Sequence, residues 1–90
     1  MSKIDPTLAQ AGSAQKPAPA QQGKVTSLTV AFDPAFPKPP VVVVTPFWRR
    51  ATAVPLPPET VKEVTTTHFV VTSVNGADDY FINWIAVPTP

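Results

Sequence analysis

The chain has 90 residues, with seven Lys and Arg against six Asp and Glu, and it contains no cysteine. This length allows one small domain, which would bury only about 60% of the surface that its unfolded chain exposes. Disulfides and thiolate metal sites are excluded, the scattered basic residues predict no nucleic-acid partner, and association with other subunits is the remaining means of stabilisation.

The N-terminal residues, 1–6, lack the apolar core of a signal peptide. The longest uncharged apolar run, Val41 to Val44, is too short to cross a bilayer. We therefore expect a protein made in the cytoplasm without membrane insertion. Release as part of a virion is compatible with that expectation.

Residues 1–23 consist mainly of Ala, Gln, Pro and Ser, with Ile4 and Leu8 as the only larger aliphatic residues besides Met1. Such a composition buries too little apolar area to offset the chain entropy lost on folding. We predict a flexible, low-complexity N-terminal arm that docks on neighbouring protein subunits.

Residues 24–90 contain every aromatic residue and are rich in Val and Thr, a composition typical of strands. Leu28, Val30 and Phe32 alternate with small or polar residues, which is the period of a half-buried strand. Residues 75–79 have the composition of a hairpin loop. We predict an all-β fold, a small six-stranded antiparallel β-sandwich, with strands at 27–32, 41–48, 52–54, 60–65, 69–74 and 80–87.

Two positions indicate how this sandwich is packed. The consecutive valines Val41 to Val44 predict a strand buried on both faces, or one with the core on one face and a subunit interface on the other. Trp84 alternates with Ile82 and Ala86, so we assign it to the core.

The sequence offers little for catalysis, since it has a single histidine, His68, no cysteine and no glycine-rich phosphate loop. No Ser-His-Asp or Cys-His arrangement is recognisable, and we predict no enzyme activity, no cofactor and no metal site.

Two short segments are candidates for binding a carbohydrate or a protein partner. In the first, Trp48 stands beside Arg49 and Arg50, residue types that stack on sugars and dominate binding hot spots. Its alternative is a core tryptophan followed by two solvated arginines. In the second, Asp78, Asp79 and Tyr80 offer carboxylates and a ring to sugar hydroxyls or Ca²⁺, and the alternative is a solvated turn with a tyrosine capping the sandwich.

Three segments resemble the H-type lectin domain: Phe32 and Phe36 ahead of Pro40 and the valine strand, residues 64–71, and the run from Asn83 to Ala86. The resemblance covers roughly residues 25–87. It implies a six-stranded sandwich that forms trimers, sometimes doubled to hexamers, and binds galactose or N-acetylgalactosamine at subunit interfaces.

The chain departs from that family in the hairpin that would carry the sugar site. Fifteen positions separate Phe69 from Trp84, and the loop at 75–79 contains neither an aromatic residue nor a histidine. His68 stands where the family has glycine. We therefore expect a non-enzymatic structural or adhesion subunit of a larger particle, such as a phage tail or virion. The alternative is a free soluble lectin that uses Trp48, Arg49, Asp78 and Tyr80.

Overall fold

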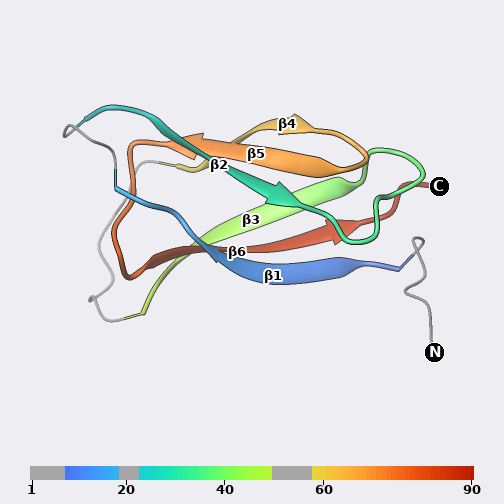
Figure 1. Cartoon of the computed structure of the whole chain (residues 1–90), viewed down its shortest axis with the longest axis horizontal. Coiled ribbons are helices and arrows are strands. Elements are labelled where there is room, and N and C mark those ends of the chain that lie inside the picture. The colour runs from blue at the N-terminus through green and yellow to red at the C-terminus, as the bar shows by residue number, and fades with distance from the viewer. Residues whose placement is uncertain (1–7, 19–22, 50–57) are drawn as a thin grey trace.

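The computed structural model describes residues 8–18, 23–49 and 58–90, which contain six strands and no helix. The strands are β1 (Gln10–Gln15), β2 (Thr26–Ala31), β3 (Val41–Trp48), β4 (Thr60–Val64), β5 (His68–Ser73) and β6 (Tyr80–Val87). They form two antiparallel three-stranded layers, which we name sheet A (β1-β6-β3) and sheet B (β2-β5-β4) (Figure 1). The predicted all-β fold with six antiparallel strands is confirmed.

Alternating apolar residues determine which face of each strand meets the core. In β5, Phe69 and Val71 are fully buried, and their β2 partners in the register, Val30 and Leu28, pack against the same core. In β6, Tyr80, Ile82 and Ala86 are buried, whereas Ile85 and Val87 point to the opposite face. A period of two residues thus places one set of side chains between the sheets.

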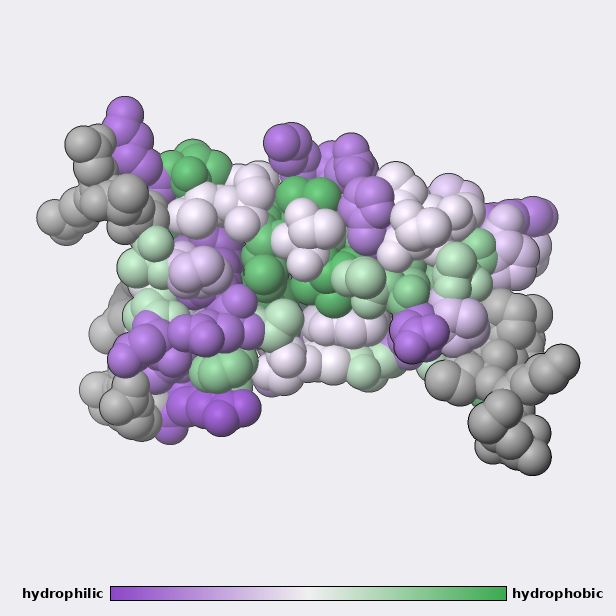
Figure 2. All heavy atoms as spheres, viewed as in Figure 1, coloured by the Kyte–Doolittle hydropathy of each residue, from purple (hydrophilic) through white to green (hydrophobic). Residues whose placement is uncertain are grey.

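Aromatic rings form the centre of this core. The Phe32 ring lies 4.9 Å from Phe36 in an edge-to-face arrangement and 5.7 Å from Phe69, measured between ring centroids. Trp84 contacts the same group, with its ring 5.4 Å from that of Phe69. In the space-filling view, hydrophobic residues lie along the middle of the molecule, with hydrophilic residues to either side (Figure 2). The prediction that Trp84 packs in the core is confirmed.

The N-terminal part of the chain differs from the predicted flexible arm, because Gln10–Gln15 form β1 at the edge of sheet A. Strand pairing with β6 uses backbone groups, so it needs no apolar side chains. Gly12 lies opposite Trp84, and a Cβ at this position would lie 2.9 Å from the indole Nε1. The absence of a side chain at Gly12 therefore makes room for the core tryptophan. The predicted strand at 52–54 lies outside the described residues, as do residues 1–7 and 19–22 of the predicted arm.

The side chain of Gln10 connects β1 to the loop that follows β2. Its Nε2 donates to the Pro34 carbonyl oxygen at 2.7 Å, and its Oε1 accepts from the Asp33 amide at 3.0 Å. Both hydrogen bonds cross from sheet A to the segment leaving sheet B, so β1 helps to hold the two layers together. None of the described segments forms a helix of the length and hydrophobicity needed to span a membrane.

Candidate functional site

Sheet A is apolar on both faces, and the face turned away from the core is the main candidate for interaction. In the β3–β6 register, Val41 stands opposite Val87 and Val43 opposite Ile85. Beyond them follow the Thr45–Asn83 pair and then the Phe47–Phe81 pair. These residues, together with Ala11, Ser13 and Gln15 of β1, are the side chains that we call the outer face of sheet A.

The exposure of this face is unusual for its composition. Val41 and Val43 are 56% and 57% exposed, Phe47 is 44% exposed, and Ile85 and Val87 are each 43% exposed. An antiparallel sheet with one solvated face normally carries polar side chains there.

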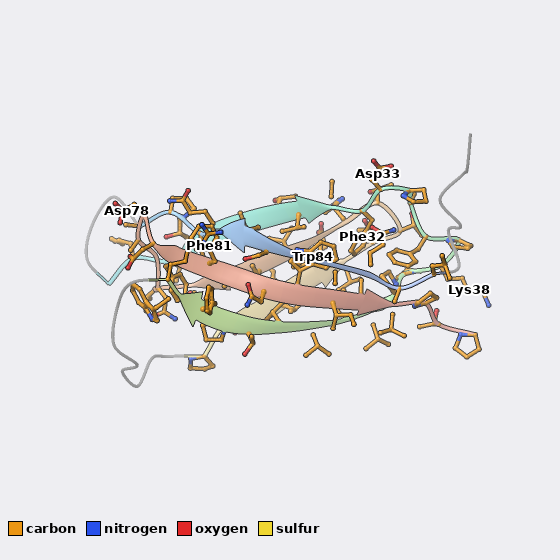
Figure 3. The ribbon with its side chains drawn as sticks, turned by 90° about the horizontal axis from the view of Figure 1, so that it is seen from below. Phe32, Asp33, Lys38, Asp78, Phe81 and Trp84 are labelled. Carbon is orange, nitrogen blue, oxygen red and sulfur yellow. The ribbon has the colours of Figure 1, made fainter. Side chains whose placement is uncertain are left out.

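The outer face of sheet B has the opposite character. Its described side chains are mostly polar or charged, and they include Ser27, Thr29, Lys62, Glu63, His68 and Thr72. The contrast between the two sheets places the unpartnered apolar surface on sheet A. Seen from that side, β6 and β3 lie in front of sheet B, with Phe81 near one end of the molecule and Lys38 near the other (Figure 3).

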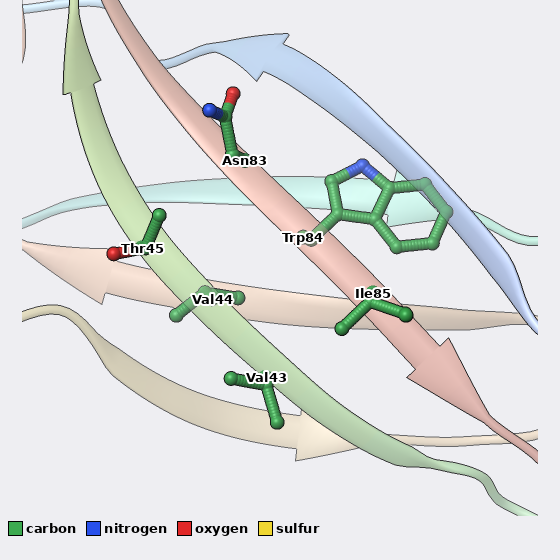
Figure 4. A pocket seen from close by; sticks show the side chains of 6 residues that line it. All are labelled: Val43, Val44, Thr45, Asn83, Trp84 and Ile85. Carbon is green, nitrogen blue, oxygen red and sulfur yellow. The ribbon is translucent and has the colours of Figure 1, made fainter.

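A shallow hollow of about 240 Å³ lies on this sheet between β3 and β6 (Figure 4). Val43, Thr45, Asn83 and Ile85 surround it, and the two inward-facing residues Val44 and Trp84 complete its lining. No residue of sheet B contributes, so the hollow opens on the outer face. The side-chain oxygen of Asn83 is buried and has no hydrogen-bond partner.

The predicted binding residues that the structure describes come together at the end of sheet A where β3 ends and β6 begins. Trp48 pairs with Tyr80 in the register, and their ring centroids lie 4.7 Å apart. Tyr80 is fully buried, and Trp48 is half-buried against the core. Their rings pack against each other and the core, so neither ring is presented as a platform for a sugar.

Arg49 is exposed beyond the end of β3, on the same side of the sheet as Phe47 and Phe81. Its guanidinium carbon lies 4.0 Å from the centroid of the Phe81 ring, a cation–π contact, and its amide donates to the Asp79 carbonyl oxygen at 3.0 Å. Asp78 is exposed, and its carbonyl oxygen accepts a hydrogen bond from Gln15 Nε2 at 3.1 Å. Arg50 lies outside the described residues.

Inside the same end of the sandwich lies a polar cluster that the sequence did not indicate. The ammonium group of Lys16 is buried and donates to the carbonyl oxygens of Ser73, at 3.2 Å, and Asn75. Burial lowers the pKa of Lys16, while the nearby Glu59 carboxylate opposes that shift. Lys16 belongs to the segment predicted as a flexible arm, and the pairing of β1 with β6 brings it beside Tyr80, whose carbonyl oxygen accepts from the Lys16 amide at 2.9 Å.

Tyr80 belongs to this cluster through its hydroxyl group. Burial raises the pKa of Tyr80 to about 12, and the charge of Glu59 acts in the same direction. The hydroxyl has Asn75 and Glu59 as its polar neighbours but makes no hydrogen bond of ordinary geometry. The cluster therefore anchors the end of β1 against the β5–β6 connection and does not form an open site.

The single histidine has a structural environment in the β4–β5 hairpin. His68 Nε2 lies 2.7 Å from the Glu63 carboxylate, and Nδ1 lies within 3.2 Å of the hydroxyl groups of Thr65 and Thr67. Both ring nitrogens thus have partners within the hairpin. Across residues 8–18, 23–49 and 58–90, no three potential ligands among His, Asp and Glu group closely enough to hold a metal ion.

Comparison with known proteins finds no family model, no curated protein and no solved structure that matches this chain.

Proposed function

We propose that this protein is a non-enzymatic structural or adhesion subunit that works as an oligomer within a larger particle, such as a phage tail or virion. The observation that carries the proposal is the apolar outer face of sheet A. Exposed patches of this kind on a small sandwich are typical of protein–protein contacts. A 90-residue domain also gains proportionally more from buried intersubunit area than a large one does.

The H-type lectin resemblance supports the same arrangement, since it implies a trimer packed along its strands on a six-stranded sandwich. Two layers of three antiparallel strands are compatible with that architecture. In the proposed particle, the residues before β1 dock on neighbouring subunits.

The test inserts a charge into the apolar face. Val43→Lys places an ammonium group at the edge of the hollow, where covering it would leave the charge buried and unpaired. The matched control is Thr29→Lys, on the polar outer face of sheet B. We expect size-exclusion chromatography to show an oligomer for the wild type and for Thr29→Lys, but a folded monomer for Val43→Lys. Equal elution of Val43→Lys and wild type would overturn the proposal.

A free soluble lectin is the second candidate, and one observation favours it. Arg49 contacts the Phe81 ring at the end of sheet A, and Asp78 is hydrogen-bonded there to Gln15, the strand partner of Phe81, so that a ring and polar groups suited to sugar recognition share this end. A glycan screen for galactose-type ligands with wild type and Phe81→Ala separates the candidates. Binding that is lost in Phe81→Ala would favour the lectin, and no binding by the wild type would leave the structural subunit.

A further inference from the structure

The β4–β5 hairpin carries a hydroxyl group, an imidazole and a carboxylate in one hydrogen-bonded chain. His68 Nε2 lies 2.7 Å from the Glu63 carboxylate, and its Nδ1 lies 3.0 Å from the Thr67 hydroxyl oxygen. A hydroxyl bonded to a base that a third group orients is the arrangement that activates serine and threonine nucleophiles. The chain is open to solvent: the side chains of His68 and Glu63 are 32% and 50% exposed, and Thr67 is exposed.

A β-bulge in β4 brings the carboxylate into this chain. Between the Val61 pair and the Glu63 pair, the β4–β5 register shifts by one residue, Lys62. With regular pairing, Glu63 would stand opposite Phe69, which is fully buried, and would point into the core. The extra residue therefore turns Glu63 to the outer face of sheet B, beside His68.

Thr65 decides which hydroxyl group His68 can activate. Its Oγ1 accepts hydrogen bonds from the amides of Thr67 and His68, each at 3.1 Å, and donates to the His68 carbonyl oxygen at 3.2 Å. Both lone pairs and the proton of this hydroxyl are therefore in use. The hydroxyl left to donate to Nδ1 is that of Thr67, which is also the more exposed of the two.

The carboxylate fixes the position of the imidazole proton. A carboxylate only accepts hydrogen bonds, so the 2.7 Å contact assigns the proton of the neutral His68 ring to Nε2. Nδ1 then holds the free electron pair and accepts from the Thr67 hydroxyl. When Nδ1 takes up the Thr67 proton, the Glu63 carboxylate stabilises the imidazolium that forms.

We propose that Thr67 is an acylation site for activated esters and thioesters, with His68 as its general base and Glu63 as a positioning residue. Thr67 Oγ1 bonds to the acyl carbon as its proton passes to His68 Nδ1. The bond from the acyl carbon to the leaving oxygen or sulfur then breaks, and the leaving group takes that proton. The products are an ester of Thr67 and a free alcohol or thiol. This single modification goes beyond the proposed role in assembly and does not depend on it.

Acetylation of the full chain by 4-nitrophenyl acetate, mapped by peptide mass spectrometry, tests the proposal. Neutral hydroxylamine removes acetyl esters but not acetylated lysines, so it identifies the hydroxyl products. Thr29, exposed on the same face of sheet B, is the internal control. We expect Thr67 to be acetylated at least about tenfold faster than Thr29, and His68→Gln and Glu63→Ala each to lower the Thr67 rate by at least about tenfold. Equal rates at Thr67 and Thr29, or an unchanged Thr67 rate in a His68→Gln variant with wild-type circular dichroism, would overturn the proposal.

The protonation of the ring is a second test, which the wild-type protein alone can answer. His68 is the single histidine of the chain, so nitrogen-15 NMR of the imidazole reports its tautomer without overlap. We expect the proton on Nε2 in the wild type and a mixture of tautomers in Glu63→Ala. An Nδ1 proton on the neutral wild-type ring would overturn the assignment of His68 as the base, whether or not His68→Gln folds. A tautomer unchanged in Glu63→Ala would overturn the positioning role of Glu63.

Discussion

Gly76 lies where the connection between β5 and β6 crosses the chain leaving β1. A Cβ at this position would overlap the Pro17 carbonyl oxygen and would lie 2.9 Å from the Ala18 Cα atom. Both neighbours are backbone atoms, so no side-chain rotation relieves the overlap. The Ala77 amide donates to the Lys16 carbonyl oxygen at 3.1 Å, which holds the two segments in contact.

We predict that Gly76→Ala lowers the free energy of unfolding by more than about 2 kcal/mol, because the backbone must separate. Gly23→Ala is the control: Gly23 has a φ of +82° but open space around its Cβ position, so only the left-handed conformation is penalised, by about 1 kcal/mol. Chemical denaturation of the two variants measures the difference. A cost for Gly76→Ala no greater than that for Gly23→Ala would contradict the close approach.

Tyr80 gives the structure a pH dependence that is directly observable, since it is the single tyrosine of the chain. Its pKa is raised to about 12 in the folded protein, against about 10 in an unfolded chain. The folded state therefore retains the proton between these values, and the stability present below pH 10 is lost as the pH rises through 12. The loss amounts to roughly 3 kcal/mol.

We expect absorption by tyrosinate to appear only near pH 12 in the native protein, or together with unfolding at lower pH. In denaturant, the midpoint should return to about 10. Circular dichroism on the same samples distinguishes titration from unfolding. A native midpoint near 10 with the fold intact would show that the hydroxyl is accessible to solvent.

At the scale of elements, alternation in the sequence predicts most of the strands. The predicted strands at 41–48 and 80–87 coincide with β3 and β6, and those at 27–32 and 69–74 differ from β2 and β5 by one residue. Because each of these strands buries one face, apolar residues recur at every second position of its sequence. For Val41 to Val44 the structure shows core packing on one face only: Val42 and Val44 pack against the core, and Val41 and Val43 are exposed. The subunit interface predicted for the exposed pair stays a prediction.

The sequence alone could not predict the strand β1 or the packing of Trp48 on Tyr80 at the end of sheet A, for a physical reason. The segment Gln10–Gln15 has no apolar alternation, because its pairing with β6 is made by backbone groups and Gly12 accommodates a tryptophan from another strand. The Trp48–Tyr80 pair depends on the β3–β6 register, which joins residues 32 positions apart. Composition favours both residues as binding groups, and only the register places their rings against the core.

The contribution of β1 is testable by truncation. Removing residues 1–16 deletes the edge strand, the Gln10 hydrogen bonds and the buried Lys16 ammonium, and it exposes one edge of β6. We expect this truncated chain to lose cooperative thermal unfolding. Removing residues 1–7 leaves every described strand in place and should preserve the transition. Equal melting of the two truncated chains would mean that β1 is dispensable.

At the scale of the whole molecule, the sandwich has one polar exterior and one apolar exterior. Its core is formed between the sheets by Phe32, Phe36, Phe69 and Trp84, so the valines and phenylalanines on the outer face of sheet A are not required to fill it. In the proposed assembly, a further protein layer covers these side chains. Function on this account lies in assembly, with the accessible end around Arg49 and Phe81 left for other contacts.

The central claim is that this chain assembles through sheet A. The most direct measurement is the solution mass of the wild-type protein by light scattering, from the highest attainable concentration through serial dilution. The account predicts a mass of two or more copies that falls toward the 9.6 kDa monomer on dilution, with a trimer expected from the H-type lectin resemblance. A mass that stays at 9.6 kDa at every concentration would contradict it.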